Sequence, residues 1–380
     1  MLSLHTNSAA LSAQNSISKT QQSLSTSMTR LSTGYRINSA MDDAAGLQIA
    51  TRLKAQTSGM AMAMRNTQNA TSMIQTADGA LGEANNILVR MKDLATQAAD
   101  SSANASDKVA MQSEYDALGT ELTNILGNTS FGGQKLLNSA ASAGDIAAAT
   151  LAKTTAATAA TTASATAATS LATYNTAQTT YAGSGTVADA DAMNLAQAQY
   201  NKDQLAATTA SAKSTAAIAY ETAATAAGNG GKFSTALSFQ IGASTSETMG
   251  LNVSTTLTTM QTAVKATSVN FNGFGAASGV TGTELTAGTA SPMIDKLSTA
   301  IDALGSLRSA LGAAGNRLDH VATNLANVST NTQAASGRIM DTDFATESSN
   351  MTASQMLLQA GTAMLKQSNS MSSMVMSLLQ

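Results

Sequence analysis

The sequence predicts a mainly α-helical protein built as a long antiparallel bundle, and three observations support this. Apolar residues recur every seven positions near both ends of the chain, a spacing typical of coiled coils. The chain of 380 residues holds a single proline, Pro292, so long helices can run without interruption. Charged residues make up 11% of the chain, against roughly 25% in ordinary globular proteins, so little charge repulsion opposes association.

The first expected helix lies near the N-terminus, where apolar residues seven positions apart form a stripe, Ile17, Leu24 and Leu31. Ala13, Gln21 and Met28 are expected to fill the alternate positions of the same stripe. The stripe ends at the sequence "STGYRINSAMDD", in which Gly34 is a candidate helix cap. This pattern favours coiled-coil packing of the first helix.

Three further helices are expected before the last one. The apolar pattern over residues 44–98 predicts a helix about 80 Å long at 1.5 Å per residue, longer than a compact domain needs. A third helix is expected over residues 107–125, with Gly127 as its C-cap. A fourth is expected over residues 292–339, where the chain's proline suits the first turn.

The C-terminal segment carries a second stripe with seven-residue spacing, Leu357, Met364, Met371 and Leu378. Between Met351 and Gln380 the one charged side chain is Lys366. Chain ends are normally polar, and a lone apolar stripe stabilises an isolated helix poorly in water. The stripe is therefore expected to be an interface that other molecules complete.

Residues 146–227 are dominated by Ala, Thr and Ser, and two interpretations compete. One is low-complexity disorder. The other is an Ala-packed helical hairpin divided at Gly183–Gly185, favoured because proline is absent and Ala allows close helix approach, although abundant Thr weakens it. The expected Ala face has steps of three or four: Ala149, Ala152, Ala156, Ala159, Ala163, Ala167 and Leu171.

A small β hairpin is expected over about residues 236–254. Two short segments, "ALSFQIG" and "TMGLNVS", alternate apolar and other residues, as a strand with one buried face does. The alternating apolar residues are Leu237, Phe239 and Ile241 in one segment and Met249, Leu251 and Val253 in the other.

Several classes of function are disfavoured. The net charge is −3 and no basic run is present, so nucleic acid is not an expected partner. The chain has no cysteine, and His5 and His320 lie in no HExxH arrangement, so no catalytic, cofactor or metal site is expected. The acidic pairs at 42–43 and 341–343 could suggest a metal site but are interpreted as helix caps that pair with Arg36 or Arg338. No apolar run reaches the ~18 residues of a spanning helix, and no membrane insertion is expected.

Five segments resemble bacterial flagellin, in the flagellin order: "LSTGYRINSAMDDAAGLQIATRL", "TSFGGQKLL", "SFQIGASTSETM", "NRLDHVATNLANVS" and "GRIMDTDFATESSNMTASQMLLQAGTAMLKQSN". The resemblance implies a structural subunit that polymerises into the flagellar filament, with no enzymatic activity. It implies that both termini pair as a coiled coil in the innermost filament layer and become ordered only on assembly. It also implies flagellar type III export to an extracellular location, and contacts with an export chaperone, the filament cap and hook-junction proteins.

The resemblance divides the chain into three regions. Residues 1–43 and 341–380 would form the inner coiled-coil domain, and residues 44–145 and 228–340 a helical rod domain that contains the β hairpin. Residues 146–227 would be a variable, surface-exposed insertion.

The segment "NNILVRMKDLATQAAD" resembles the stretch of flagellin that a vertebrate Toll-like receptor senses. The family's contact positions fall on Arg90, Leu94 and Glu114, and Arg90 and Leu94 are expected to be exposed on one helix face. The alternative is that these residues only pack filament subunits.

Four residues lie in matching segments near the junction of the terminal and rod-like parts, where they would fix helix register or cap helices: Arg36, Asn38, Asp43 and Arg317. Two rival functions remain. A hook–filament junction protein shares flagellin-like ends, but "FGGQKLL" and the complete C-terminal segment argue against it. A membrane-active translocator is disfavoured by polar faces rich in Ser, Thr and Gln with few Lys or Arg.

Overall fold

The computed structural model describes residues 7–138, 143–226, 230–271, 282–286 and 288–378, without the side chains of 143–145, 226 and 372–378. The chain separates into two compact units. The terminal unit comprises Met1–Met64, Gly242–Glu247 and Thr323–Gln380, and the central unit comprises Arg65–Ile241 and Thr248–Ala322.

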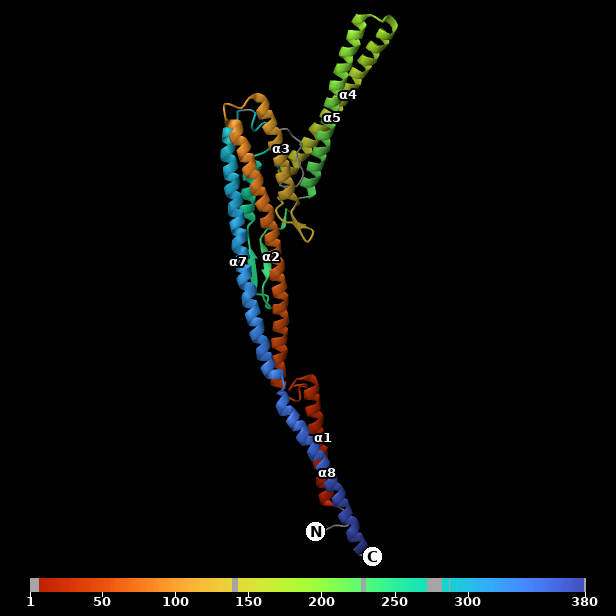
Figure 1. The fold of residues 1–380 in the computed structure, drawn as a ribbon, viewed down its shortest axis with the longest axis vertical. Coiled ribbons are helices and arrows are strands. Elements are labelled where there is room, and N and C mark those ends of the chain that lie inside the picture. Colours follow the sequence, from red (N-terminus) through yellow and green to blue (C-terminus); the bar gives the residue numbers. More distant parts are fainter. Residues whose placement is uncertain (1–6, 139–142, 227–229, 272–281, 287, 379–380) are drawn as a thin grey trace. The chain divides into compact units, whose positions relative to one another are not determined.

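The described residues are mainly helical, as expected, with two small antiparallel sheets. The helices are α1 Ser8–Thr33, α2 Ala44–Ala99, α3 Ala105–Asn128, α4 Ala143–Ser184, α5 Val187–Ala226, α6 Ser254–Lys265, α7 Ala290–Met340 and α8 Phe344–Leu378, with a short 3-10 turn, η1, at Lys232–Ser234. The strands are β1 Ser130–Phe131, β2 Gln134–Lys135, β3 Leu237–Gln240 and β4 Thr248–Leu251. Figure 1 shows these elements in chain order.

Local sequence signals set several helix ends. Asn104 and Asp107 form a reciprocal capping box at the start of α3. Gly34 ends α1 in the left-handed region, with φ 75°, and its N–H donates to the Arg30 carbonyl. The prediction that Gly127 caps α3 is wrong, because the helix continues to Asn128 and Gly127 is buried inside its last turn.

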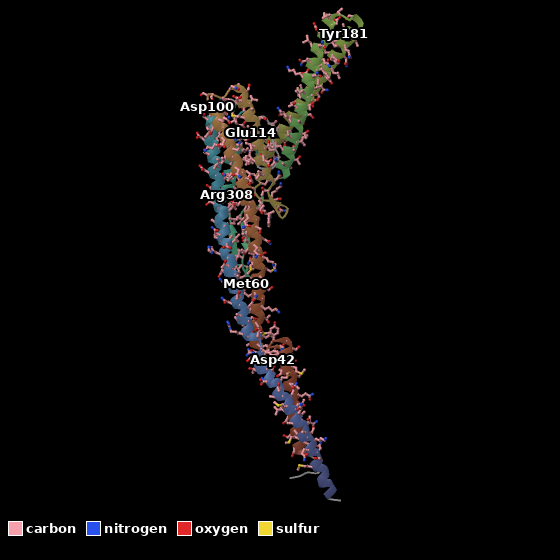
Figure 2. All side chains as sticks on the ribbon, viewed as in Figure 1. Asp42, Met60, Asp100, Glu114, Tyr181 and Arg308 are labelled. Atoms are coloured by element: carbon pink, nitrogen blue, oxygen red, sulfur yellow. The ribbon has the colours of Figure 1, made fainter. Side chains whose placement is uncertain are left out.

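The core of the central unit lies between the long helices. Here α2 and α7 run antiparallel (Figure 1). Arg308 of α7, labelled in Figure 2, pairs with Asp78 of α2, with Nε 2.8 Å from Oδ1. Leucines of both helices are completely or almost completely buried in one cluster, among them Leu81, Leu88, Leu304 and Leu311. Burial of each such side chain contributes about 1.5–3 kcal/mol, so the central unit has a core of its own.

The expected β hairpin is present, and both of its strands belong to the central unit. Strands β3 and β4 pair antiparallel, with Leu237 opposite Leu251 and Phe239 opposite Met249. Met249 and Leu251 are buried in the same cluster as the leucines, which is what alternation along a half-buried strand predicts.

The Ala-rich segment forms a helical hairpin, as favoured over disorder. Helices α4 and α5 lie side by side (Figure 1), and Gly185 turns between them with φ 62°. Tyr174 and Tyr200 stack across the pair with ring centroids 6.4 Å apart. The inward positions of α4 alternate steps of three and four: Ile146, Ala149, Lys153, Ala156, Ala160, Ala163 and Ala167.

Three members of the expected Ala face are therefore misassigned, and one of them, Leu171, is 38% exposed. Ala152 and Ala159 are exposed, because the strict coiled-coil spacing of 3.5 residues places Lys153 and Ala160 inward instead. Lys153 is accommodated by Glu221 of α5, whose carboxylate lies 2.5 Å from its Nζ.

Candidate functional site

The two ends of the chain meet in the terminal unit. Helices α1 and α8 lie side by side (Figure 1). They run antiparallel, because Asn7 bonds to Ser368 at one end of the pair, where Nδ2 lies 3.2 Å from Oγ, and Tyr35 bridges to Asp341 at the other. Apolar stripes on these two helices are the predicted assembly site.

The inward face of α1 contains the three predicted residues Ile17, Leu24 and Leu31, all half-buried. Of the residues expected beside them, Gln21 is exposed and is therefore misassigned, whereas Met28 is on the side of α8 but is 56% exposed and so is not buried in the contact. The inward face of α1 instead includes Ala13, Thr20 and Ser27. Each of these residues lies four positions before one of the three apolar residues, whereas Gln21 and Met28 lie four positions after one.

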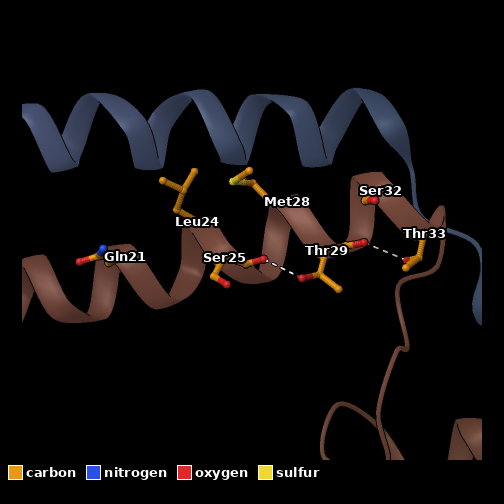
Figure 3. A pocket seen from close by; sticks show the side chains of 7 residues that line it. All are labelled: Gln21, Leu24, Ser25, Met28, Thr29, Ser32 and Thr33. Carbon is orange, nitrogen blue, oxygen red and sulfur yellow. Dashed lines mark hydrogen bonds between the residues drawn. The ribbon is translucent and has the colours of Figure 1, made fainter.

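A shallow groove of about 520 Å³ lies along one side of α1 (Figure 3). Leu24 and Met28 point from it toward α8, while Ser25 and Thr29 form part of its lining. This side of the helix pair is therefore partly apolar and open.

Helix α8 presents three adjacent rows of residues, each with seven-residue spacing. An inner row, half-buried toward α1, contains Met351, Leu358 and Leu365. A shared row of small or polar residues contains Glu347, Ser354, Gly361 and Ser368. An outer row contains the predicted stripe Leu357, Met364 and Met371, which are 62%, 68% and 57% exposed.

The predicted C-terminal stripe thus faces away from α1 within the chain. The side chain of Leu378, its last predicted member, lies outside the described side chains. The apolar contact with α1 is made by the inner row, in which each residue directly follows the corresponding residue of the outer row. This row is not among the sequence predictions.

The helix pair has almost no core of its own. Among the described side chains of α1 and α8, the buried ones are Ser27 and Glu347, and neither is apolar. A pair of helices that buries so little apolar surface is only marginally stable in water, because burial does not offset the free energy of helix nucleation and chain ordering. The pair is therefore an incomplete packing unit.

Two charged residues of this pair were missed by reasoning from the sequence. Arg30 of α1 lies 3.8 Å from Glu347 of α8, Nη1 to Oε2, and the Glu347 residue is only 7% exposed. A usable signal was present: each helix carries only two charged residues, Lys19 and Arg30 in one, Glu347 and Lys366 in the other.

The predicted register residues at the junction form backbone contacts. The Arg36 N–H donates to the Met340 carbonyl at 2.6 Å, and its Nη2 donates to the Ile339 carbonyl at 3.0 Å. These bonds tie the end of α1 to the end of α7. Arg317 is exposed on α7 in the central unit and forms no ion pair with a described residue.

The loop before α2 is organised by carboxylates. Asp43 precedes the helix, and its Oδ1 accepts the Gly46 N–H at 2.8 Å. The N–H groups of Asn38 and Ser39 donate to Asp42 Oδ2, and the bond from Ser39 is the largest cause of the lowered pKa of Asp42. These arrangements are those of helix and turn caps.

The three predicted receptor-contact residues are only partly brought together. Arg90 and Glu114 are exposed and paired, with Nη2 2.7 Å from Oε1 (Glu114 is labelled in Figure 2). Leu94 is 2% exposed, so the expectation of an exposed leucine beside Arg90 is wrong. The reason is that Leu94 continues the buried stripe of α2 with Met91 and Ala98.

Neither metal nor membrane chemistry is indicated within the part of the chain that the structure describes. Its His, Asp and Glu side chains form no group of three that could ligate a metal ion. None of its helices combines the length and apolar character required to cross a membrane.

Comparison with known families matches two regions of the chain, one near each end. The sequence model of the bacterial flagellin N-terminal helical region matches residues 4–142, and that of the C-terminal helical region matches residues 294–379. The chain belongs to the bacterial flagellin family. The two matched regions contain α1 and α8, the incomplete helix pair.

Individual flagellins match one region of the chain. It is 49% identical over 137 residues to Flagellin C and 51% identical over 137 residues to Flagellin A of Vibrio cholerae serotype O1. It is 50% identical over 139 residues to Polar flagellin F of Vibrio parahaemolyticus serotype O3:K6. These alignments cover 36–37% of this chain and 36–37% of each relative, so the match spans about a third of the relatives' length.

Among solved structures, the crystal structure of Bacillus cereus flagellin is 23% identical, covering 69% of this chain and 88% of that one. The TM-score of 0.36 is too low to indicate a shared overall arrangement.

Proposed function

We propose that this chain is a structural subunit that polymerises with identical copies into the filament of the bacterial flagellum, outside the cell. Family models matching both ends of the chain support this proposal. The observation that carries it is the helix pair α1–α8, which buries no apolar residue among its described side chains while the outer row of α8 is exposed.

The energetics favour completion by neighbours. Ordering a residue costs roughly 1–2 kcal/mol, whereas full burial of a leucine or methionine side chain returns about 1.5–3 kcal/mol. Half-buried side chains on a two-helix contact do not offset that cost, but the same side chains surrounded by several helices do. The termini would therefore become ordered as copies add, and polymerisation would be cooperative and slow to start without a seed.

The weak charge of α8 suits such an interface. Glu347 and Lys366 are its only charged residues, so neighbouring copies can approach with little repulsion. Methionines in the outer row can adapt to an irregular inter-subunit surface. In this proposal residues 1–43 and 341–380 form the inner domain, 44–145 and 228–340 the rod, and 146–227 an outward-facing insertion.

Further partners follow from family membership alone. We propose export through the flagellar type III apparatus with an export chaperone, and addition beneath a filament cap that starts from hook-junction proteins. A vertebrate Toll-like receptor would contact the exposed pair Arg90–Glu114 on the unassembled chain. The role is structural and includes no catalytic residue, cofactor or metal.

The test is seeded polymerisation of a variant that removes the outer row by Leu357→Gln, Met364→Gln and Met371→Gln. The matched control carries Leu151→Gln, Leu195→Gln and Leu205→Gln, three leucines of the α4–α5 hairpin that are 68%, 73% and 70% exposed. Sedimentation and electron micrographs should show filaments from the control and none from the outer-row variant. Filaments of normal length and yield from both variants would contradict the proposal.

A further inference from the structure

Helix α8 contains two complete coiled-coil seams that overlap. The inner row and the shared row alternate in steps of four and three, from Glu347 to Ser368. The shared row and the outer row do the same, from Ser354 to Met371. At 100° per residue the shared row lies about 40° from the inner row on one side and about 60° from the outer row on the other. Either seam could therefore meet α1.

Apolar content does not decide between the two seams. The inner row supplies Met351, Leu358 and Leu365, and the outer row supplies Leu357, Met364 and Met371. These two sets of three contain only leucine and methionine, so the burial free energy that they supply in the two pairings is closely matched. Some other contact must select the inner row.

The contacts of α8 with α1 that set their position come from the shared row. The Asn7 side chain donates to the Ser368 carbonyl at 3.3 Å and to its Oγ at 3.2 Å. A Cβ added at Gly361 would lie 2.9 Å from Ile17 Cγ1, so this glycine makes room for Ile17. Together with the Arg30–Glu347 pair, these contacts fix the axial register of the two helices.

The ion pair has no substitute at another register. A slip of one heptad would place Glu347 opposite Ser23 or Ile37 instead of Arg30. The other basic residue of α1, Lys19, is exposed at a different level of the pair. A buried carboxylate without its cation costs far more than a buried pair, so slipped registers are disfavoured.

The ion pair also lies on a defined side of the helix contact. A polar groove of about 690 Å³ is lined by Arg30, Glu347 and Asn350, among other residues. The partly apolar groove with Leu24 and Met28 is lined by other residues of α1. Around the axis of α1, Arg30 lies about 60° from Ser27 in one direction. Leu31, in the same row as Leu24, lies about 40° from Ser27 in the other direction.

Rotation of α8 to the alternative seam would separate this pair. Asn350 begins the row that continues as the outer row, and it already lies in the polar groove beside Arg30. Turning that row inward carries Glu347 away from Arg30 and toward the side of Leu24 and Leu31. The carboxylate would then be buried against leucine without a cation.

We propose that the Arg30–Glu347 pair is a specificity-determining contact: it selects the inner row of α8 for pairing with α1 and thereby leaves the outer row for a second copy of the chain. Arg30 Nε is buried without a hydrogen-bond partner among the described residues, so the pair is better suited to selecting an arrangement than to adding stability. The inference rests on the proposed function, because it assigns the outer row to the neighbouring copy.

Disulfide trapping in the unassembled chain tests the selection, because oxidation captures α1–α8 pairs even where they form only transiently before assembly, and the natural sequence has no cysteine. Thr20→Cys is combined either with Leu358→Cys of the inner row or with Leu357→Cys of the outer row. The native background should cross-link through position 358 at least about tenfold faster than through 357, the ratio that corresponds to about 1.4 kcal/mol. Glu347→Gln should bring the two rates within about threefold, that is, to about 0.7 kcal/mol.

Charge reversal separates selection from general stability. Arg30→Glu together with Glu347→Arg should restore the preference for position 358, whereas either reversal alone should abolish it. Lys366→Gln, which removes the other charge of α8 at an exposed position, is the matched control and should leave the preference unchanged. An unchanged ratio in Glu347→Gln, or no restoration in the double variant, would overturn the inference.

Seeded polymerisation of the same proteins keeps the two proposals apart. Glu347→Gln should raise the critical concentration at least about tenfold relative to Lys366→Gln, because the outer row is then partly consumed within the chain. If the chain with natural Arg30 and Glu347 fails to polymerise from seeds, the proposed function fails whatever the cross-linking ratio. If it polymerises and Glu347→Gln polymerises equally well, the inference alone fails.

Discussion

Replacement of Leu358 by alanine should cost little in the unassembled chain and much in the filament. Leu358 belongs to the inner row and is half-buried against α1. Leu358→Ala removes three carbon groups at about 0.8 kcal/mol each when fully buried, so half burial gives roughly 1 kcal/mol. Leu81→Ala, at a site that is 0% exposed, should cost about 2–5 kcal/mol because a cavity remains.

The two substitutions should therefore separate in two assays. In urea unfolding of the unassembled chain, followed by circular dichroism, Leu81→Ala should lower the midpoint of the main transition and Leu358→Ala should leave it unchanged. In seeded polymerisation, Leu358→Ala should raise the critical concentration by roughly 30-fold or more, the equivalent of about 2 kcal/mol. A Leu358→Ala chain that loses as much stability as Leu81→Ala before assembly, and polymerises normally, would refute the reasoning.

Three other outcomes are expected. Tyr115→Phe should lower the free energy of unfolding, measured by urea titration, by about 1–3 kcal/mol. The fully buried Tyr115 hydroxyl donates to the Thr267 carbonyl at 2.6 Å, and this carbonyl would lose its partner. Burial raises the pKa of Asp116 above its ordinary 3.8, so the folded chain holds that proton more tightly and the stability from this group falls as pH rises through the raised pKa. Asp116→Asn removes this falling contribution, so stability should rise more steeply with pH across the acid range; an unchanged slope would count against the assignment. Arg90→Ala should weaken activation of a Toll-like-receptor reporter cell by the unassembled chain, since it breaks the exposed pair with Glu114; equal activation would remove that contact from the proposal.

The sequence predicted the helices better than their partners. A spacing of seven locates a stripe on a helix, and the long helices, the β hairpin and the Ala-rich hairpin all followed from such patterns. Spacing does not say which neighbouring stripe meets which helix. In α8 the inner and outer rows are equally apolar, so spacing alone does not decide which of them meets α1, and the shared row between them, with Ser354 and Gly361, has no apolar signal.

The candidate site shows the same physical limit. The seven-residue spacing predicts that Met28 fills an alternate position of the stripe, yet the structure buries Ser27 instead, since close helix approach favours a small side chain. Leu94 was assigned outward by analogy with a receptor contact, although its own position in the α2 stripe places it in the core. Burial depends on the neighbours that a helix face meets, and these come from distant parts of the chain.

The central claim is that α1 and α8 are completed only by copies of the same chain. Amide hydrogen exchange, measured by mass spectrometry on the unassembled chain and on seeded filaments, tests it most directly. In the unassembled chain, amides of α1 and α8 should exchange fast, while those around Leu81 and Leu88 of α2 are protected. In the filament, the amides of α1 and α8 should become protected as well. Protection of α1 and α8 equal to that of the α2 core before assembly would contradict the account.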